Sequence, residues 1–166
     1  MIRFAKWRPD DNAQKKSLRE LLTSAFDWSC ANFDEVFNSF DSDHAFLLED
    51  NRSHVISCLF VYDVVDDDGD MWAFLFALAT HPDYRRRGLM TSLYKDFAEP
   101  CLKRSYRGAC LVPANEDLIP YYERLGFRVV STQGQEPSCQ MANDYRGGSI
   151  HLDVLREDQS TGLDGE

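Results

Sequence analysis

A short basic segment, Arg85-Arg86-Arg87-Gly88, lies in an acidic chain and has the residue types of a phosphate site. An apolar run ends before it at Pro82, and helical spacing of apolar residues starts after it near Leu89. A helix N-terminus presents unpaired backbone N–H groups, and arginines donate charge-assisted hydrogen bonds to phosphate oxygens. Glycine allows close approach of the backbone. The pattern predicts a diphosphate site at a strand–loop–helix junction; a basic surface loop is the simpler alternative.

The segment differs from two common phosphate-binding patterns. It lacks the glycines and the Lys-Ser/Thr pair of the Walker pattern, and it lacks the Gly-x-Gly-x-x-Gly of dinucleotide-binding loops. The expected ligand therefore carries phosphate but belongs to another class. Farther along, Asn115 and Tyr122 stand seven residues apart in a second strand-to-helix segment, which ends in Leu125-Gly126-Phe127.

Both segments resemble the GNAT superfamily of acyl-CoA-dependent N-acetyltransferases. The family's acetyl-CoA pattern is Arg/Gln-x-x-Gly-x-Gly/Ala, and the segment 78–91 is similar to it through the run that starts at Arg85 and ends at Met90. The segment 112–127 resembles the family's strand-to-helix region, with its Asn and Tyr at the same spacing and the same Gly-Phe ending. The two segments cover about residues 71–131, whereas residues 1–70 match by element order alone.

The resemblance implies a set of cofactor-binding residues and one catalytic residue. The backbone of Leu78, Ala79 and Thr80 would pair with the pantetheine arm of acetyl-CoA. The diphosphate would be held by the segment 85–91, namely Arg85, Arg86, Arg87, Gly88, Leu89, Met90 and Thr91. Asn115 would hydrogen-bond the cofactor arm, and Tyr122 would lie near the thioester sulfur. Met90 departs from the pattern, because the family usually has Gly or Ala there, so its side chain must turn away from the cofactor.

The expected reaction is transfer of an acetyl group from acetyl-CoA to a primary amine by direct attack on the thioester. The acceptor is a small-molecule or protein amine. The backbone N–H of Thr80 or a neighbour could stabilise the oxyanion. Tyr122 could protonate the departing thiolate or hydrogen-bond its charge; a phenol of pKa ~10 is a modest acid for a thiol of pKa ~8.5.

A general base is harder to assign. Some family members place a Glu five residues before the Asn, and that position is Cys110 here, which is expected to be a buried structural thiol. The remaining candidates are Asp43, Glu49, Asp70 and His81, each more typical of a surface group.

Two other interpretations stay open. The first is a non-catalytic acyl-CoA-binding sensor or interaction module on the same fold, which Met90 and Cys110 leave room for. The second is a generic α/β binding domain with a basic loop. Trp28, Phe33 and Phe37 could line an acceptor pocket, although burial in the core explains them better.

Composition narrows the class of protein. The chain has 166 residues, and a formal charge of −10 argues against nucleic acid as the main partner, although it could attract a cationic amine. Five scattered cysteines without a Cys-x-x-Cys pair argue against a zinc site, and no other metal is expected. No apolar run reaches the ~18 residues of a membrane span, and the first residues do not resemble a signal peptide. We therefore expect a cytoplasmic protein with no membrane partner, and a homodimer remains open.

The order of elements predicts an α/β fold with a mixed, mostly antiparallel sheet and helices on both faces. Residues 1–155 are expected to form one acyltransferase domain, and the polar residues 156–166 a disordered tail. Strands are expected at 2–7, 44–49, 53–65, 71–80, 109–112, 127–131 and 150–155. Helices are expected after Pro9 and at 32–40, 89–98 and 116–125, with Pro100 ending or kinking the third near Glu99 and Pro120 breaking the fourth early. A loop is expected at 133–148, and the Asp-rich segment 66–70 is expected to form a solvated hairpin turn rather than a calcium loop.

Overall fold

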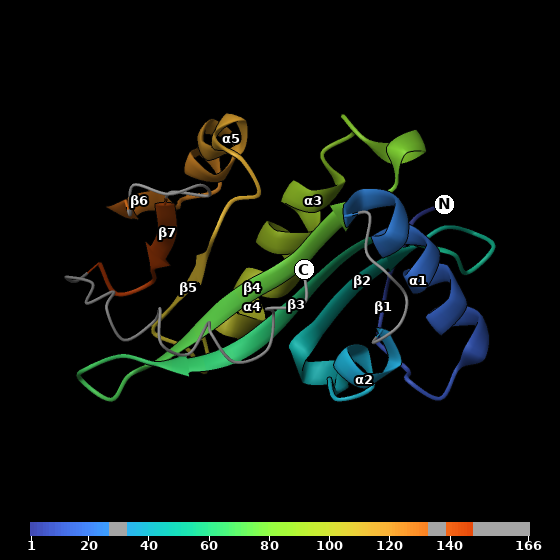
Figure 1. Ribbon diagram of the computed structural model, residues 1–166, viewed down its shortest axis with the longest axis horizontal. Coiled ribbons are helices and arrows are strands. Elements are labelled where there is room, and N and C mark those ends of the chain that lie inside the picture. Colours follow the sequence, from blue (N-terminus) through green and yellow to red (C-terminus); the bar gives the residue numbers. More distant parts are fainter. Residues whose placement is uncertain (27–32, 133–138, 148–166) are drawn as a thin grey trace. The chain divides into compact units, whose positions relative to one another are not determined.

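The computed structural model describes residues 1–26, 33–132 and 139–147, and these contain a seven-stranded mixed sheet in the order β1-β2-β3-β4-β5-β7-β6 (Figure 1). The strands are β1 (Arg3–Ala5), β2 (Ala45–Glu49), β3 (Val55–Val65), β4 (Met71–Thr80), β5 (Gly108–Leu111), β6 (Arg128–Thr132) and β7 (Cys139–Asp144). The longer helices are α1 (Asn12–Phe26), α2 (Phe33–Phe37), α3 (Leu89–Ser92), η4 (Leu93–Ala98), α4 (Glu99–Leu102) and α5 (Ile119–Arg124). Strands β4 and β5 pair in parallel, and the pairs β1–β2, β2–β3, β5–β7 and β6–β7 are antiparallel. The expected fold class is confirmed.

The chain divides into two compact units, which are described separately. The first unit holds Met1–Val61 and Phe76–Glu99, and the second holds Tyr62–Leu75 and the described residues from Pro100 onward. Each long strand of the β3–β4 hairpin therefore contributes to both units.

In the first unit, helices cover both faces of the sheet. The β2–β3 register points Phe46 and Phe60 to opposite faces. Phe46 contacts Phe4, which stacks on Phe97 of η4 with ring centroids 4.7 Å apart. Phe60 lies against Phe37 of α2, with centroids 4.9 Å apart. The aromatic side chains thus anchor one helical layer on each face.

The helix that follows the basic segment is longer than predicted. Pro100 was expected to end or kink this helix near Glu99; the helix does not end there, because α3, η4 and α4 form one run from Leu89 to Leu102. Across η4 the helix widens to hydrogen bonds of five-residue spacing, and the Glu99 N–H donates to the Tyr94 carbonyl. Because the wider turn gives up the ordinary four-residue pairing, it can pass a proline that lacks an N–H.

The second unit contains a strand where a loop was predicted. Strand β7 occupies Cys139–Asp144, inside the expected loop 133–148, and lies between β5 and β6. The prediction was wrong because the glycines and the proline of this segment stand outside the six strand residues, and because a strand buried between two partners need not alternate. The expected strand 150–155 and tail 156–166 lie outside the described residues, as does Trp28.

Smaller differences concern turns and element ends. The expected helix 116–125 is divided early, into a short helical turn at Glu116–Leu118 and α5 from Ile119, and Pro120 stands in the first turn of α5, where its missing N–H has no partner to lose. Gly126 ends α5 with φ +105°, as its position after the helix predicted.

Phe33 and Phe37 are buried in the core, which favours packing over an acceptor pocket. Among the helices that the structure describes, none has the length and apolarity to cross a membrane.

Candidate active site

The end of β4 departs from regular strand geometry. Ala77 has φ +55°, a left-handed conformation that is uncommon outside glycine, and its carbonyl accepts a hydrogen bond from the buried Cys58 thiol at 3.1 Å. Beyond Ala77, the side chain of Ala79 is buried, whereas those of Leu78 and Thr80 are half-buried. The three residues predicted to pair with pantetheine therefore follow a break in the extended backbone, which can redirect their N–H and C=O groups. The left-handed conformation of Ala77 could not have been predicted from the sequence, because an alanine side chain does not favour it.

The three arginines of the basic segment have different surroundings. The Arg85 Nε donates to the Thr80 carbonyl at 3.0 Å, so this side chain folds back on the strand end. The Arg87 guanidinium lies over the Tyr84 ring, 5.1 Å from its centroid. Arg86 is exposed and has φ +65°, a conformation that costs a non-glycine residue about 1–2 kcal/mol. Strain of this kind at an exposed arginine is typical of ligand-binding loops.

Gly88 completes the turn into the helix. It also has a left-handed backbone, with φ +72°, and a Cβ added there would meet no atom within 4 Å. Its carbonyl accepts from the Ser92 N–H at 2.9 Å, which starts the helix. Left-handed residues close together turn successive N–H groups toward one side and create a concavity suited to an anion. The segment Arg85–Thr91, called here the basic cradle, therefore combines three arginines, two left-handed residues and the start of a helix.

In the second unit, Asn115 begins the short helical turn before α5. Its Oδ1 accepts from the Asp117 N–H at 3.0 Å, which caps the turn. The residue is exposed, and among the described residues its Nδ2 group has no partner. Asn115 is therefore held in place by its oxygen while its amide N–H₂ is left to donate.

Tyr122 lies on α5 with its ring largely buried, at 7% exposure. Its ring meets those of Tyr121 and Phe127 edge-on, with centroids 5.3 and 6.2 Å away. Burial, with a smaller contribution from Tyr121, raises the pKa of the Tyr122 phenol to about 12. The hydroxyl therefore stays protonated through the physiological range and can act as a hydrogen-bond donor.

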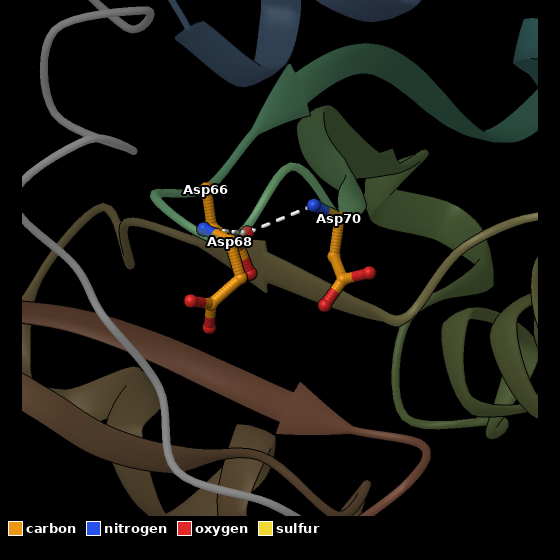
Figure 2. Close-up of side chains that lie close together, drawn as sticks. All are labelled: Asp66, Asp68 and Asp70. Atoms are coloured by element: carbon orange, nitrogen blue, oxygen red, sulfur yellow. Dashed lines mark hydrogen bonds between the residues drawn. The ribbon is translucent and has the colours of Figure 1, made fainter.

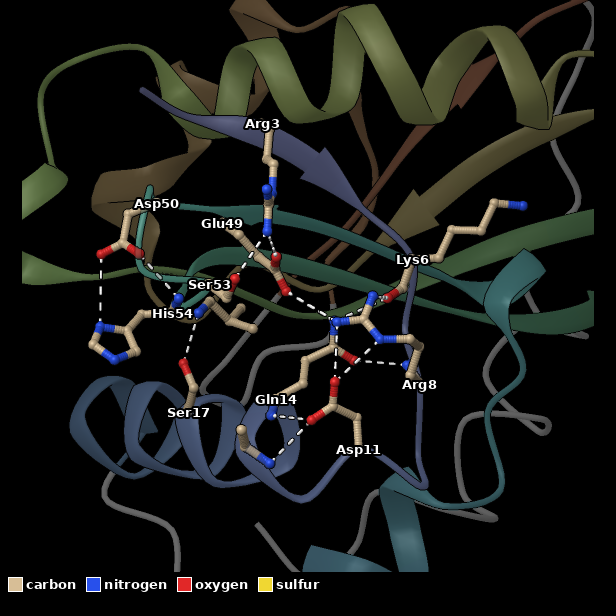
Figure 3. Close-up of polar contacts among 12 residues, drawn as sticks. Arg3, Lys6, Arg8, Asp11, Gln14, Ser17, Glu49, Asp50, Ser53 and His54 are labelled. Atoms are coloured by element: carbon tan, nitrogen blue, oxygen red, sulfur yellow. Dashed lines mark hydrogen bonds and ion pairs between the residues drawn. The ribbon is translucent and has the colours of Figure 1, made fainter.

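Two of the four candidate bases are engaged in structural contacts. The Glu49 carboxylate is 1% exposed, and it accepts from Arg3 at 3.3 Å and from Gln14 at 3.0 Å (Figure 3). Asp70 accepts from Arg107 at 3.1 Å. Both carboxylates thus have cationic or amide partners of their own.

The other two candidates are no better placed. The His81 Nδ1 accepts from the Asp83 N–H at 3.1 Å, so the lone pair that a base would use is already occupied. Asp43 is an exposed residue in a short helical turn. Cys110 is fully buried, as predicted, and burial raises the pKa of its thiol above the usual range, which argues against a nucleophile.

The Asp-rich turn is more ordered than the expected solvated loop. Asp66, Asp68 and Asp70 offer carboxylate oxygens within 4.8 Å of one another (Figure 2). Asp66 is nevertheless buried, and it accepts from two backbone N–H groups of the turn and from the Trp72 indole at 2.8 Å. The Arg107 guanidinium lies 3.3 Å from Asp66 and 3.1 Å from Asp70. The negative charge of the cluster is therefore balanced by Arg107, and the cluster stabilises the turn of the β3–β4 hairpin.

The chain belongs to the acetyltransferase (GNAT) family, whose sequence model matches residues 15–127. This span includes the basic cradle, Asn115 and Tyr122, so the residues singled out above are part of the matched region. Among curated proteins, none matches the sequence.

Solved structures of low sequence identity share the fold. One is a chain of the NatC complex bound to Gag peptide and CoA, with a TM-score of 0.70, 15% identity, and coverage of 86% of this chain and 98% of that chain. Another is the ribosomal-protein-S18-alanine N-acetyltransferase from Escherichia coli, with a TM-score of 0.66, 21% identity, and coverage of 93% and 99%. A third is a GNAT acetyltransferase from Brucella melitensis in complex with acetyl-CoA, with a TM-score of 0.65, 16% identity, and coverage of 91% and 92%.

Proposed function

We propose that this chain transfers an acetyl group from acetyl-CoA to a primary amine of a peptide or protein. The observation that carries the proposal is the basic cradle, in which left-handed Arg86 and Gly88 precede a helix N-terminus. Family membership and neighbours solved with CoA or acetyl-CoA support the donor. Two neighbours whose names specify a peptide or a protein alanine support the acceptor class.

In the proposed binding mode, the cradle holds the diphosphate of acetyl-CoA. Backbone N–H groups of the first helical turn and the Arg86 guanidinium donate to its oxygens, while Gly88 leaves room for the ligand. Arg85 and Arg87 add positive charge from the positions fixed by Thr80 and Tyr84. The backbone of Leu78, Ala79 and Thr80 pairs with the pantetheine arm, and the Asn115 Nδ2 donates to it.

In the proposed reaction, the amine nitrogen attacks the thioester carbonyl and forms the new C–N bond. The carbonyl oxygen becomes an oxyanion that a backbone N–H near Thr80 stabilises. The C–S bond then breaks, the nitrogen of the new amide releases its extra proton to water, and the leaving thiolate receives a hydrogen bond from the Tyr122 phenol before water protonates it. With the Tyr122 pKa at about 12 and that of an ordinary thiol at ~8.5, full proton transfer is uphill by roughly 5 kcal/mol, so hydrogen bonding is the main contribution.

The proton of the amine leaves before attack. Glu49, Asp70 and His81 are each engaged in hydrogen bonds, Asp43 is an exposed residue in a short helical turn, and Cys110 stands where some family members have a strand carboxylate. We therefore expect the enzyme to use the neutral amine, so that the rate follows the deprotonated fraction of the acceptor. An α-amine, with a pKa of ~8, would then be favoured over a lysine, with a pKa of ~10.4, near neutral pH.

The proposal is tested by following thiol release from acetyl-CoA with peptides that carry either a free α-amine or only a lysine amine. We expect release that requires both acceptor and enzyme, and that is faster with the α-amine at pH 7. The replacement of the strand carboxylate by Cys110 favours one other function, a non-catalytic acyl-CoA sensor. Stabilisation of the fold by acetyl-CoA without release for any acceptor would select the sensor and reject the transferase.

A further inference from the structure

Gln140, on β7, is a buried amide without a partner. The residue is 3% exposed, and among the described residues neither its Nε2 nor its Oε1 takes part in a hydrogen bond. A side-chain amide moved from water into a protein interior without hydrogen bonds is destabilising, so most buried amides in proteins are paired. An unpaired one needs an explanation, and the described residues of the free protein supply no partner for it.

Two comparisons within the chain make Gln140 unusual. Gln14 is equally buried, yet its Oε1 accepts from the Arg8 N–H at 2.7 Å and its Nε2 donates to Lys6 and Glu49 (Figure 3). Arg107 has an unpaired Nε, but its terminal nitrogens form ion pairs. Within the described part of the chain, Gln140 is the buried side chain whose whole polar group lacks a partner.

The position of Gln140 within the second unit suggests what the partner is. Met141 lies opposite Leu111, the last residue of β5, so Gln140 is beside the carboxyl end of that strand. From this end the chain continues to Asn115 and Tyr122, and carboxyl ends of parallel strands are where open α/β sheets bind ligands.

The register also settles the face on which Gln140 lies. Because Ala142 pairs with Cys110, Gln140 shares the face of these two buried, small residues. Asn143 points to the opposite face of β7. There its side chain lies so close to Gly126, which follows α5, that it would contact a Cβ added to that glycine. Gln140 therefore lies on the face of β7 opposite to Asn143, on the same side as Cys110 and Ala142.

We propose that Gln140 determines acceptor specificity by binding a peptide group next to the reacting amine. A carboxamide offers both donors and an acceptor, and a peptide group matches it with one C=O and one N–H. A carboxylate would leave the Oε1 unmatched, and an ammonium would leave the Nε2 unmatched. The inference rests on the proposed acetyl transfer and narrows its acceptor to amines that carry an adjoining amide.

The first test uses stability, with Gln14 as the matched control. Gln140→Met replaces an unpaired amide by an apolar side chain of similar shape, so its melting temperature should rise by roughly 2–4 °C. Gln14→Met breaks satisfied hydrogen bonds, so its melting temperature should fall. A fall for Gln140→Met comparable to that for Gln14→Met would mean that the amide serves the free fold, and it would overturn the inference.

The second test uses acceptors that differ in the amide alone. Alaninamide and isopropylamine are compared at equal concentrations of the neutral amine, in the wild type and in Gln140→Met. We expect kcat/KM for alaninamide to fall about 10- to 100-fold in the variant, with little change for isopropylamine or in the KM for acetyl-CoA.

The possible failures are distinguishable. An active wild type with an unchanged ratio between the two acceptors in Gln140→Met overturns the inference alone. An equal loss for both acceptors also overturns it, since the residue would then not read the amide. A wild type that releases no thiol with either amine or with any peptide overturns the proposed function, and the inference falls with it.

Discussion

At the scale of single residues, Tyr122 shows how burial changes the chemistry open to a side chain. Its ring packs against Tyr121 and Phe127, and burial raises the pKa of its phenol to about 12. A raised pKa makes the phenol a weaker acid, but it also keeps the proton in place at alkaline pH. Tyr122 is thus suited to donate a hydrogen bond to a thiolate throughout the range in which an amine becomes neutral.

Tyr122→Phe should lower kcat by about 10- to 100-fold, because one hydrogen bond to a developing charge is lost. The affinity for acetyl-CoA should change little. In the wild type, the rate should not decline near pH 10, where an ordinary tyrosine ionises, because the protonated form persists up to the raised pKa. The measurement is kcat as a function of pH for both proteins, with the melting temperature checked at each pH. A decline centred near pH 10 in the wild type that is missing in Tyr122→Phe would contradict this role.

At the scale of elements, the basic cradle depends on backbone conformation as much as on charge. Arg86 and Gly88 both have positive φ, and the helix begins directly after them. Two effects of a side chain at Gly88 can be separated by mutation. One is the cost of putting a side chain on a left-handed residue, and the other is the loss of space for a ligand.

Gly88→Ala should weaken acetyl-CoA binding at least 10-fold and also reduce stability by about 1–2 kcal/mol. Gly69 is a suitable control, because it has φ +84° and its added Cβ would also meet nothing within 4 Å, but it lies in the β3–β4 turn. Gly69→Ala should show the same loss of stability without loss of affinity. Calorimetric titration with acetyl-CoA, together with chemical denaturation, measures both quantities. Equal affinities of the two variants would show that Gly88 does not approach the ligand.

The elements also show what the sequence could reveal. The strand–loop–helix junction at Arg85–Gly88 was predictable. An apolar run ends before it, three arginines and a glycine follow, and apolar residues at helical spacing begin after it. The left-handed conformations of Ala77 and Arg86 were not predictable, because neither side chain favours them. Strand β7 was missed because its neighbouring glycines suggested a loop, and its pairing with β5 and β6 depends on residues far away in sequence. The burial of the Gln140 amide was not predictable from the sequence for the same reason, because Gln140 lies on this strand.

At the scale of the whole molecule, an acidic chain must manage the repulsion of its own carboxylates. Around the β3–β4 turn this is done by Arg107, which contacts Asp66, Asp70 and Asp144 at 3.1–3.3 Å. Burial alone would raise the pKa of Asp66. The hydrogen bonds from Trp72 and from two backbone N–H groups, together with Arg107, outweigh that effect and hold the pKa below its usual value.

Asp66→Asn should lower the free energy of unfolding by about 2–4 kcal/mol at pH 7. Because the folded-state pKa is depressed, the stabilising effect of Asp66 is fully present above about pH 4 and is lost as the pH falls through the lower value. The difference between wild type and variant should therefore shrink below about pH 4. Denaturation across this range measures it, with the exposed Asp67→Asn as control. A difference that is constant with pH would contradict the ionic role of Asp66.

The central claim, that the basic cradle lets this chain use acetyl-CoA as an acetyl donor, is tested most directly by comparing two donors. The kcat/KM for acetyl-CoA is measured against that for S-acetyl-pantetheine, which lacks the diphosphate, in the wild type and in Arg86→Gly. The variant relieves the left-handed strain while it removes the guanidinium. We predict that the wild type prefers acetyl-CoA by about 100-fold or more, as two charge-assisted hydrogen bonds would give, and that Arg86→Gly loses about 10-fold of this preference. Equal use of the two donors by the wild type, or an Arg86→Gly preference unchanged from wild type, would contradict the account.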